Sequence, residues 1–143
     1  MISYNKTILL VEDNKNDELL AIRALKKTNV NSHISIARDG VEAINFIFNS
    51  DTEKLPELIL LDLNLPKLNG LEVLKKIKSN SATARIPVVI MSSSVEKNDI
   101  NSSYALGANS YLRKPVDFGD FTSMVDSLAS YWLTLNQSAK LSN

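Results

Sequence analysis

The 143-residue sequence contains no cysteine and only one histidine. Without cysteine there is no disulfide framework, no thiol nucleophile and no thiolate metal site, and one histidine cannot supply a multi-histidine zinc cluster. Lysine plus arginine and aspartate plus glutamate number 16 each, so the formal net charge is zero. A neutral chain gives no electrostatic reason to expect nucleic acid or an anionic membrane as a partner.

Long hydrophobic runs are also missing. The N-terminal stretch MISYNKTILLVEDN reaches acidic residues after four consecutive apolar positions, which is too short for a signal-peptide core or a membrane span. The composition, 44% hydrophobic and 22% charged residues, is typical of one ordinary domain. We expect a single domain over residues 1–143, with its core in residues 6–135 and a polar tail in residues 136–143. Together with the lack of cysteine, this favours a soluble protein of the reducing cytoplasm.

Five short runs predict β-strands, and they alternate with stretches whose apolar residues recur at the three- and four-residue intervals of amphipathic helices. The strand candidates are residues 8–11, 33–37, 58–61, 88–91 and 110–112. The helix candidates are residues 17–27, 41–48, 71–78, 96–106 and 118–135. The three strongest strand runs lack period-two alternation, as strands do when helices cover both faces of their sheet. The order predicts an α/β fold, a doubly wound five-stranded parallel sheet.

Two local signals mark the ends of the fourth predicted helix. Ser93 and Glu96 have the spacing of a capping box at its start. Gly107 is suited to close it, because glycine readily adopts the left-handed conformation found after helix ends. His33 stands at the start of a weak strand, and we interpret it as a surface residue or a satisfied strand residue.

Charged and hydroxyl side chains follow the predicted strands. Glu12 and Asp13 come after the first strand, Asp62 after the third, Ser92 after the fourth and Lys114 after the fifth. In doubly wound folds the carboxyl ends of the strands form the binding edge of the sheet, so we expect these side chains to converge. Clustered carboxylates repel unless a cation or hydrogen bonds offset the repulsion. Hard oxygen ligands of this kind suit Mg²⁺.

These residues and their order resemble the receiver domain of two-component response regulators, over residues 6–135. The motifs ILLVEDN, LILLDLNLP, IPVVIMSSS, LGANSYLRKPVDF and YWL are most similar to the small stand-alone regulators that serve cyanobacterial and bacterial phytochrome kinases. The resemblance implies the flavodoxin-like strand order 2-1-3-4-5. It also implies that the protein is a signalling phosphoacceptor, which catalyses only its own phosphotransfer and autodephosphorylation, and no other reaction.

The resemblance assigns the phosphoryl and metal chemistry to four residues. Asp62 would accept a phosphoryl group from a phosphohistidine on a sensor histidine kinase, possibly of the phytochrome type, and form an aspartyl phosphate. Asp13 and Asp62, with the backbone carbonyl of Asn64, would hold Mg²⁺. Glu12 would contact the metal directly or through a water molecule. A bound metal would neutralise charge on the transferring group.

The resemblance also assigns the residues that sense the phosphoryl group. Lys114 would pair with one phosphoryl oxygen, Ser92 would donate its hydroxyl to another, and Tyr111 would turn inward as an aromatic switch. The peptide bond between Lys114 and Pro115 would be cis. Asn64 and Ser94 occupy positions that border the route of the hydrolytic water, so they would tune the phosphoryl lifetime.

The last predicted helix has the apolar spacing of a packed helical seam. We expect Phe118, Phe121, Val125 and Leu128 to pack mainly on the sheet, and residues beyond them to extend past it. The face as a whole favours a homodimer through the fourth helix, the fifth strand and the fifth helix. Its candidate residues are Phe121, Val125, Leu128, Tyr131, Trp132 and Leu135.

Three other functions are compatible with the fold. A flavodoxin-like electron carrier needs a hydroxyl- and glycine-rich phosphate loop after the first strand, where this chain has VEDNKND. An aspartyl phosphatase needs a second carboxylate two residues after the first, where this chain has Asn64. A pseudo-receiver that binds partners without phosphorylation remains the alternative. Because no residues follow the last helix for an output module, we expect signalling through phosphorylation-dependent contacts with an unidentified downstream protein.

Overall fold

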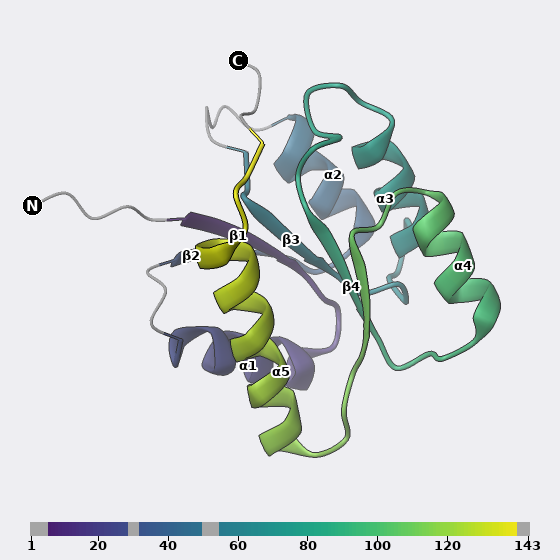
Figure 1. The fold of residues 1–143 in the computed structure, drawn as a ribbon. Helices are drawn as coiled ribbons and strands as arrows, with labels where there is room; N and C mark the ends of the chain where they lie inside the picture. Colours follow the sequence, from purple (N-terminus) through teal and green to yellow (C-terminus); the bar gives the residue numbers. More distant parts are fainter. Residues whose placement is uncertain (1–5, 29–31, 50–54, 140–143) are drawn as a thin grey trace, which may run out of the picture.

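The computed structural model describes residues 6–28, 32–49 and 55–139. One parallel sheet of five strands runs through it in the order β2-β1-β3-β4-β5 (Figure 1). The strands are β1 (Lys6–Val11), β2 (Ser32–Ala37), β3 (Leu58–Leu61), β4 (Val88–Ser92) and β5 (Ser110–Arg113). The helices are α1 (Lys15–Lys26), α2 (Gly40–Phe48), α3 (Gly70–Lys78), α4 (Lys97–Ala105) and α5 (Phe118–Ser130), followed by the π-helix η1 (Tyr131–Leu135). The predicted fold class and strand order are confirmed.

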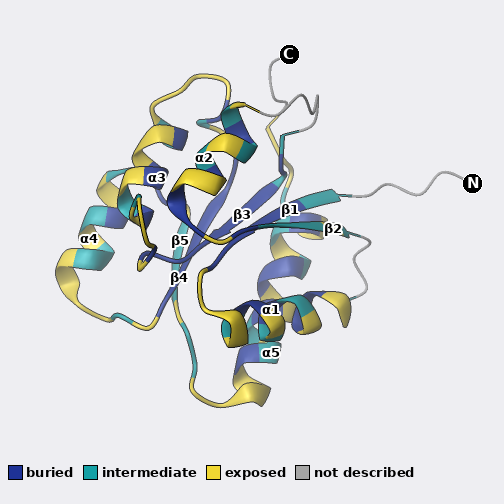
Figure 2. Ribbon diagram, turned by 180° about the vertical axis from the view of Figure 1, so that it is seen from behind, coloured by how far each residue is buried: buried dark blue, intermediate teal, exposed yellow. Residues whose placement is uncertain are grey.

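Successive strand residues point into two apolar layers, one on each face of the sheet. Leu9 and Ile59 belong to the layer covered by α2 and α3, whereas Ile8 and Leu60 belong to the layer covered by α1 and α5. All four of these side chains are completely buried. Figure 2 shows β1 and β3 buried, while the outer sides of the helices are exposed. The strands read as continuous apolar runs because helices cover both faces.

The strand register brings the carboxyl ends of β1, β3 and β4 level with one another. Val11 is the register partner of Leu61, and Leu61 is the partner of Ile90. The backbone ladder continues one residue further, because the Asp62 N–H donates to the Val11 carbonyl at 3.1 Å. Parallel pairing with this register therefore places the residues that follow the strands at one edge of the sheet.

The start of α4 differs from the expected capping box. The helix begins after Glu96, which makes no side-chain cap hydrogen bond, and Ser93 is exposed. Ser94 ties the loop to the helix instead: its hydroxyl accepts from the N–H of the N-cap residue Glu96 at 3.2 Å and donates to the Asp99 carboxylate at 2.5 Å. The prediction of a Ser93 capping box was wrong because α4 begins at Lys97 with Glu96 as its N-cap, which leaves Ser93 three residues before the cap position. Gly107 follows α4 with a φ of 106°, as expected for a helix-closing glycine.

The predicted last helix is α-helical only to Ser130 and continues as η1. Phe121, Val125 and Leu128 are buried in the core layer beneath α1 and α5, which confirms that they pack on the sheet, so their inclusion among the candidate dimer residues was wrong. These three side chains are already buried against the chain's own sheet. Phe118, expected to be buried, is 40% exposed. None of the helices in the described ranges combines the length and the apolar character that crossing a bilayer requires.

Gly70 allows α3 to begin directly against the end of β3. A Cβ atom at Gly70 would lie 2.4 Å from the Asp62 carbonyl oxygen and 2.5 Å from the Leu63 Cα. We expect Gly70→Ala to destabilise the protein by about 1–3 kcal/mol, the usual cost of overpacking. Gly119→Ala is the control, because its Cβ would meet only the flexible Asp117 carboxylate at 3.1 Å.

Urea unfolding monitored by the fluorescence of the single tryptophan, Trp132, measures both variants. The control is expected to stay within about 0.5 kcal/mol of the wild type. Equal stabilities for Gly70→Ala and the wild type would show that α3 can move away from the end of β3 at no cost.

Candidate functional site

The residues that follow β1, β3 and β5 meet at the carboxyl edge of the sheet. The Glu12 N–H donates to the Ala37 carbonyl at 3.0 Å, and the Lys114 N–H donates to the Ser92 carbonyl at 2.9 Å. Together with the Asp62 bond to Val11, these contacts fix the backbone of the loops as an extension of the sheet. Side chains from distant parts of the sequence therefore sit on a rigid frame.

Three carboxylates form the centre of the site. Oxygen atoms of Glu12, Asp13 and Asp62 lie within 4.8 Å of one another; Glu12 and Asp62 are buried, whereas Asp13 is exposed. Backbone donors orient the two buried groups, because the Asn64 N–H donates to Asp62 Oδ1 and the Asn14 N–H donates to Glu12 Oε2, each at 3.2 Å. Clustered hard oxygen atoms with one open side fit a divalent cation such as Mg²⁺.

Lys114 provides the positive charge against these carboxylates. Its ammonium nitrogen lies 2.7 Å from Glu12 Oε1, 3.0 Å from Asp17 Oδ2 and 3.2 Å from Asp62 Oδ2. Burial lowers the pKa of Lys114, but the hydrogen bond to Glu12 and the charges of Asp62 and Glu12 outweigh it, so its pKa is raised above the ordinary value. Burial raises the pKa of Glu12 to about 7, although Lys114 opposes the shift. Because the pKa of Lys114 is raised, its side chain remains an ammonium ion.

Asp17 is a member of this group that the sequence analysis missed. An acidic residue in the first turn of a helix is commonly present for its favourable interaction with the helix dipole. Asp17 was also expected to start a helix that in fact begins at Lys15. The longer helix places Asp17 in the first turn, on the side that faces the sheet edge. Its spacing of four residues from Asp13 is the only signal in the sequence.

Ser92 and Tyr111, the predicted sensing residues, are connected through Ser94. Ser92 is completely buried, and its hydroxyl oxygen accepts from the Ser94 N–H at 3.1 Å. The Tyr111 hydroxyl donates to the Ser94 carbonyl at 2.9 Å. The Tyr111 N–H donates in turn to the Tyr104 hydroxyl on α4, at 3.1 Å. A continuous path of bonds therefore joins the end of β4 to α4 and β5.

The peptide bond between Lys114 and Pro115 is trans, and no cis peptide bond occurs among the described residues. The expectation of a cis bond was wrong for this structure. The trans form of a bond before proline is favoured by about 0.5–1 kcal/mol. Here the lysine reaches three carboxylates without the sharp turn that a cis bond would provide.

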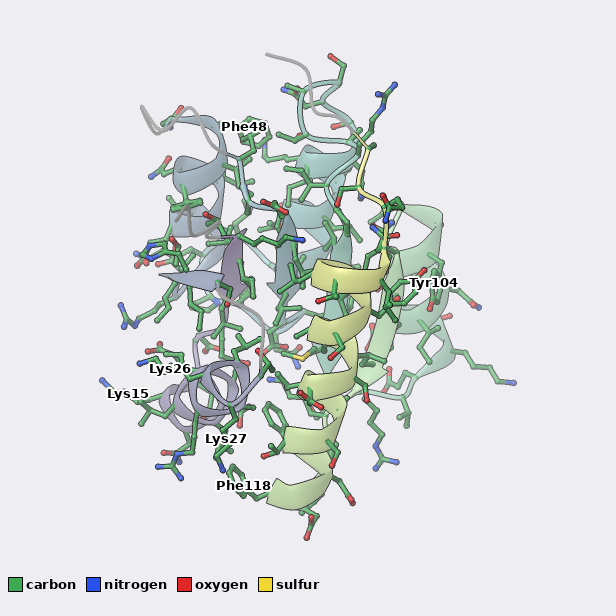
Figure 3. All side chains as sticks on the ribbon, turned by 60° about the vertical axis from the view of Figure 1, so that its left-hand side comes forward. Lys15, Lys26, Lys27, Phe48, Tyr104 and Phe118 are labelled. Carbon is green, nitrogen blue, oxygen red and sulfur yellow. The ribbon has the colours of Figure 1, made fainter. Side chains whose placement is uncertain are left out.

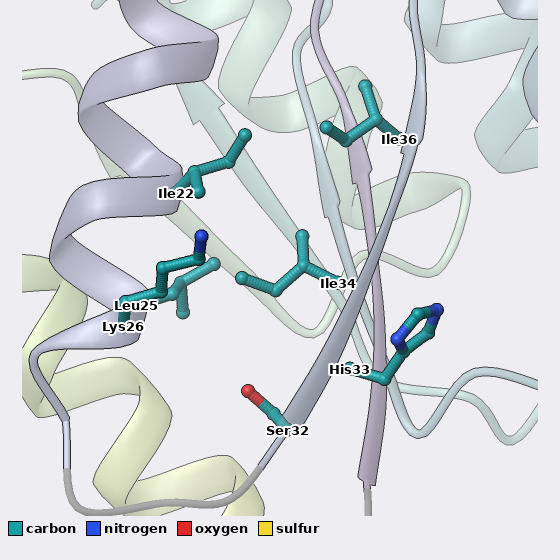
Figure 4. Close-up of a pocket in the computed structure, with 7 residues that line it drawn as sticks. All are labelled: Ile22, Leu25, Lys26, Ser32, His33, Ile34 and Ile36. Atoms are coloured by element: carbon teal, nitrogen blue, oxygen red, sulfur yellow. The ribbon is translucent and has the colours of Figure 1, made fainter.

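His33 lies away from the carboxylates and is exposed, as expected. It is near the amino end of the edge strand β2, beside a cavity of about 490 Å³ between that strand and α1 (Figure 4). In Figure 4 the side chain of Ile34 points towards α1, whereas the His33 ring points away from it. The cavity lining is Ile22, Leu25, Lys26, Ser32, His33, Ile34 and Ile36. This cavity is not part of the carboxylate site.

The chain belongs to the response regulator receiver domains. The family model, described as response regulator receiver domain, matches residues 8–126. Response regulator Rcp1 of Synechocystis sp. is 43% identical over 131 residues, which cover 90% of this chain and 89% of that protein. The probable methanogenesis regulatory protein FilR2 of Methanothrix harundinacea is 38% identical over 133 residues, covering 92% of this chain and 86% of that protein.

Two similar solved structures agree with this assignment. The phosphorylated cyanobacterial phytochrome response regulator RcpA is 38% identical, with a TM-score of 0.91 over 96% of this chain and 100% of that chain. The Mn²⁺-bound form of response regulator Rcp1 is 40% identical, with a TM-score of 0.88 over 94% of this chain and 99% of that chain. The protein is therefore a receiver-domain response regulator related to phytochrome response regulators.

The carboxylate cluster predicts stabilisation by divalent cations. We expect millimolar MgCl₂ to raise the thermal midpoint of the wild type relative to EDTA. Once the free cation exceeds its dissociation constant, each further ten-fold increase in its concentration adds about 1.4 kcal/mol to the free energy of unfolding. Asp13→Asn is expected to lose most of this response, because it removes an exposed charge that makes no hydrogen bond within the described part of the chain. Circular dichroism melting curves with and without the cation measure the effect.

Asp126→Asn is the control, since Asp126 is an exposed carboxylate on α5. It should respond to Mg²⁺ as the wild type does. The same rise in midpoint for all three proteins would mean that the cation binds elsewhere.

Proposed function

We propose that the protein is a phosphoacceptor that takes a phosphoryl group from a sensor histidine kinase onto Asp62, in a reaction that requires Mg²⁺. The observation that carries this proposal is the position of Asp62. Its carboxylate lies 3.2 Å from the Lys114 ammonium and in contact range of the Glu12 and Asp13 carboxylates. Membership of the receiver family supports the same role.

The transfer can be written with this chain's own groups. A carboxylate oxygen of Asp62 attacks the phosphorus of a phosphohistidine; an O–P bond forms, the P–N bond breaks, and the imidazole nitrogen keeps its electron pair. Lys114 pairs with a phosphoryl oxygen and offsets the charge of the transferred group. Glu12, Asp13, Asp62 and the carbonyl of Asn64 would hold Mg²⁺, which supplies further charge neutralisation when bound. Hydrolysis of the aspartyl phosphate by water would return the protein to its resting state.

The signal would leave the site through the residues that join β4 to α4 and β5. Ser92 would donate its hydroxyl to a phosphoryl oxygen. Because its oxygen also accepts from the Ser94 N–H, a movement of Ser92 would move Ser94 and its bond to the Tyr111 hydroxyl. Tyr111 would then turn, and its bond to Tyr104 would change the outer surface of α4. Asn64 and Ser94 would tune how long the phosphoryl group lasts.

We propose a phytochrome-type kinase as the phosphoryl donor, on the basis of the similarity to the phytochrome response regulator RcpA.

A surface next to the site is suited to docking of the kinase. Val116, directly after Pro115, is completely exposed, and Phe118 is partly exposed between two cations. The Arg23 guanidinium and the Lys27 ammonium lie 6.0 Å and 5.9 Å from the Phe118 ring centroid, and Figure 3 shows Lys27 beside Phe118. We propose that this exchange takes place in the cytoplasm.

We also propose a homodimer, with an interface limited to the end of α5, η1, the strand β5 beside them and α4 beyond β5. Tyr131 and Leu135 are 49% and 69% exposed. Tyr131 packs edge-on against Trp132, with 5.0 Å between the ring centroids. A cavity of about 240 Å³ beside β5 adjoins this end of the helix; its lining is Ser110, Leu112, Met124, Ser127, Leu128 and Trp132. The same surface is available to a downstream protein.

Incubation with acetyl phosphate and Mg²⁺ tests the phosphoacceptor. Intact-mass spectrometry should show one added phosphoryl group on the wild type and on Asp126→Asn, and none on Asp62→Asn. The amide keeps the shape of the side chain but removes the nucleophile. A chelator should abolish the gain. A wild type that gains no mass under any condition would favour the pseudo-receiver function.

Sedimentation velocity tests the dimer. Leu135→Asp should shift the protein towards the monomer, because a charge would be buried at the interface. Val41→Asp on α2, another exposed apolar residue, should leave the sedimentation coefficient unchanged. A wild-type monomer at micromolar concentration in both phosphorylation states would refute the proposal.

A further inference from the structure

All three N–H donors of the Lys114 ammonium are matched by carboxylates. An ammonium group has three donors and no acceptor, and Glu12, Asp17 and Asp62 each lie within hydrogen-bond distance of its nitrogen. Lys114 therefore has no donor left for a phosphoryl oxygen. To pair with one, as the proposed function requires, it has to give up one of these three bonds.

The three bonds differ in what their loss would cost. The side chains of Glu12 and Asp62 are only 3% and 9% exposed, whereas that of Asp17 is 32% exposed. A buried carboxylate that loses its cation is left poorly solvated, at a large cost. Water can replace the lysine at Asp17, and exposed ion pairs are weak. Of the three bonds, the one to Asp17 therefore breaks at the lowest cost in free energy.

The backbone at Asp17 is fixed, so only its side chain is free to exchange. The Asp17 N–H donates to the side chain of the N-cap residue Asn14 at 3.0 Å. The next residue, Glu18, is buried and accepts two bonds from Arg38, at 3.0 and 3.1 Å. These contacts hold the first turn of α1 in place. Asp17 also stands apart from the carboxylates whose oxygens cluster within 4.8 Å, so its contact is with the lysine and not with a metal site.

We infer that Asp17 is a positioning residue for the phosphoryl group: it holds the Lys114 ammonium in the resting protein and releases it to a phosphoryl oxygen. This inference rests on the proposed function. In the resting state Asp17 keeps the lysine pointing into the site. In the phosphorylated state the Asp17 carboxylate turns to solvent, and the released N–H meets the phosphoryl oxygen. Asp17 thus opposes phosphorylation by the strength of one partly exposed ion pair.

Beryllium fluoride, a mimic of the phosphoryl group on aspartate, tests this exchange at saturating Mg²⁺. Asp17→Ala should bind the mimic about two- to five-fold more tightly than the wild type, the range expected when an exposed ion pair no longer competes. The matched control is Asp120→Ala. Asp120 has the same position in the first turn of α5, and its N–H likewise donates to the N-cap side chain. The control should bind the mimic as the wild type does.

Proton exchange of the Lys114 ammonium, followed by ¹⁵N NMR, separates positioning from a general effect of charge. Exchange in Asp17→Ala should be faster than in the wild type without the mimic and equal to it with the mimic bound. A wild type that binds the mimic, with Asp17→Ala unchanged in affinity or in exchange, would overturn the inference alone. A wild type that does not bind the mimic would overturn the proposed function, and the inference with it.

Discussion

The structure of the site depends on one ammonium group surrounded by carboxylates. Lys114 joins the end of β5 to Glu12 after β1, Asp62 after β3 and Asp17 on α1. Without this cation, acidic groups from three elements would repel one another in a largely buried place. The lysine offsets only part of their charge, and the remainder favours a divalent cation and, with it, a phosphoryl group. The charge imbalance that would destabilise a simple structural cluster would therefore suit the site to the proposed phosphoryl transfer.

The path from Ser92 through Ser94 and Tyr111 to Tyr104 gives this chemistry a route to the surface. Each of its contacts is one hydrogen bond of 2.9 to 3.1 Å, so each is weak enough to exchange and directional enough to transmit a displacement. The path runs from the end of β4 to the edge strand β5, where Tyr111 packs against the margin of a core layer, and from there to α4. A change at the site can therefore alter α4 and β5 while the sheet stays intact.

Much of the fold and of the site was predictable because it rests on strong, local signals. Uninterrupted apolar runs such as Leu58–Leu61 indicate strands buried on both faces, and a parallel sheet then brings Glu12, Asp62 and Lys114 together. Asp17 was not predictable in its role, since its contact depends on where α1 begins and how its first turn faces the sheet. The predictions of a Ser93 cap, of a cis bond before Pro115 and of a buried Phe118 were wrong for a related reason. Each depends on how one side chain or loop packs, which spacing alone does not determine.

We propose that Asp62, and no other carboxylate of the cluster, receives the phosphoryl group. The most direct test is to phosphorylate the wild type with acetyl phosphate and Mg²⁺ and then reduce it with borohydride, which converts an aspartyl phosphate to homoserine. Tandem mass spectrometry of the peptides locates the homoserine. We expect homoserine at position 62 and at no other position. Homoserine in place of Asp13 or Asp17 would contradict this role of Asp62, because the nucleophile would then lie in the loop after β1 or on α1.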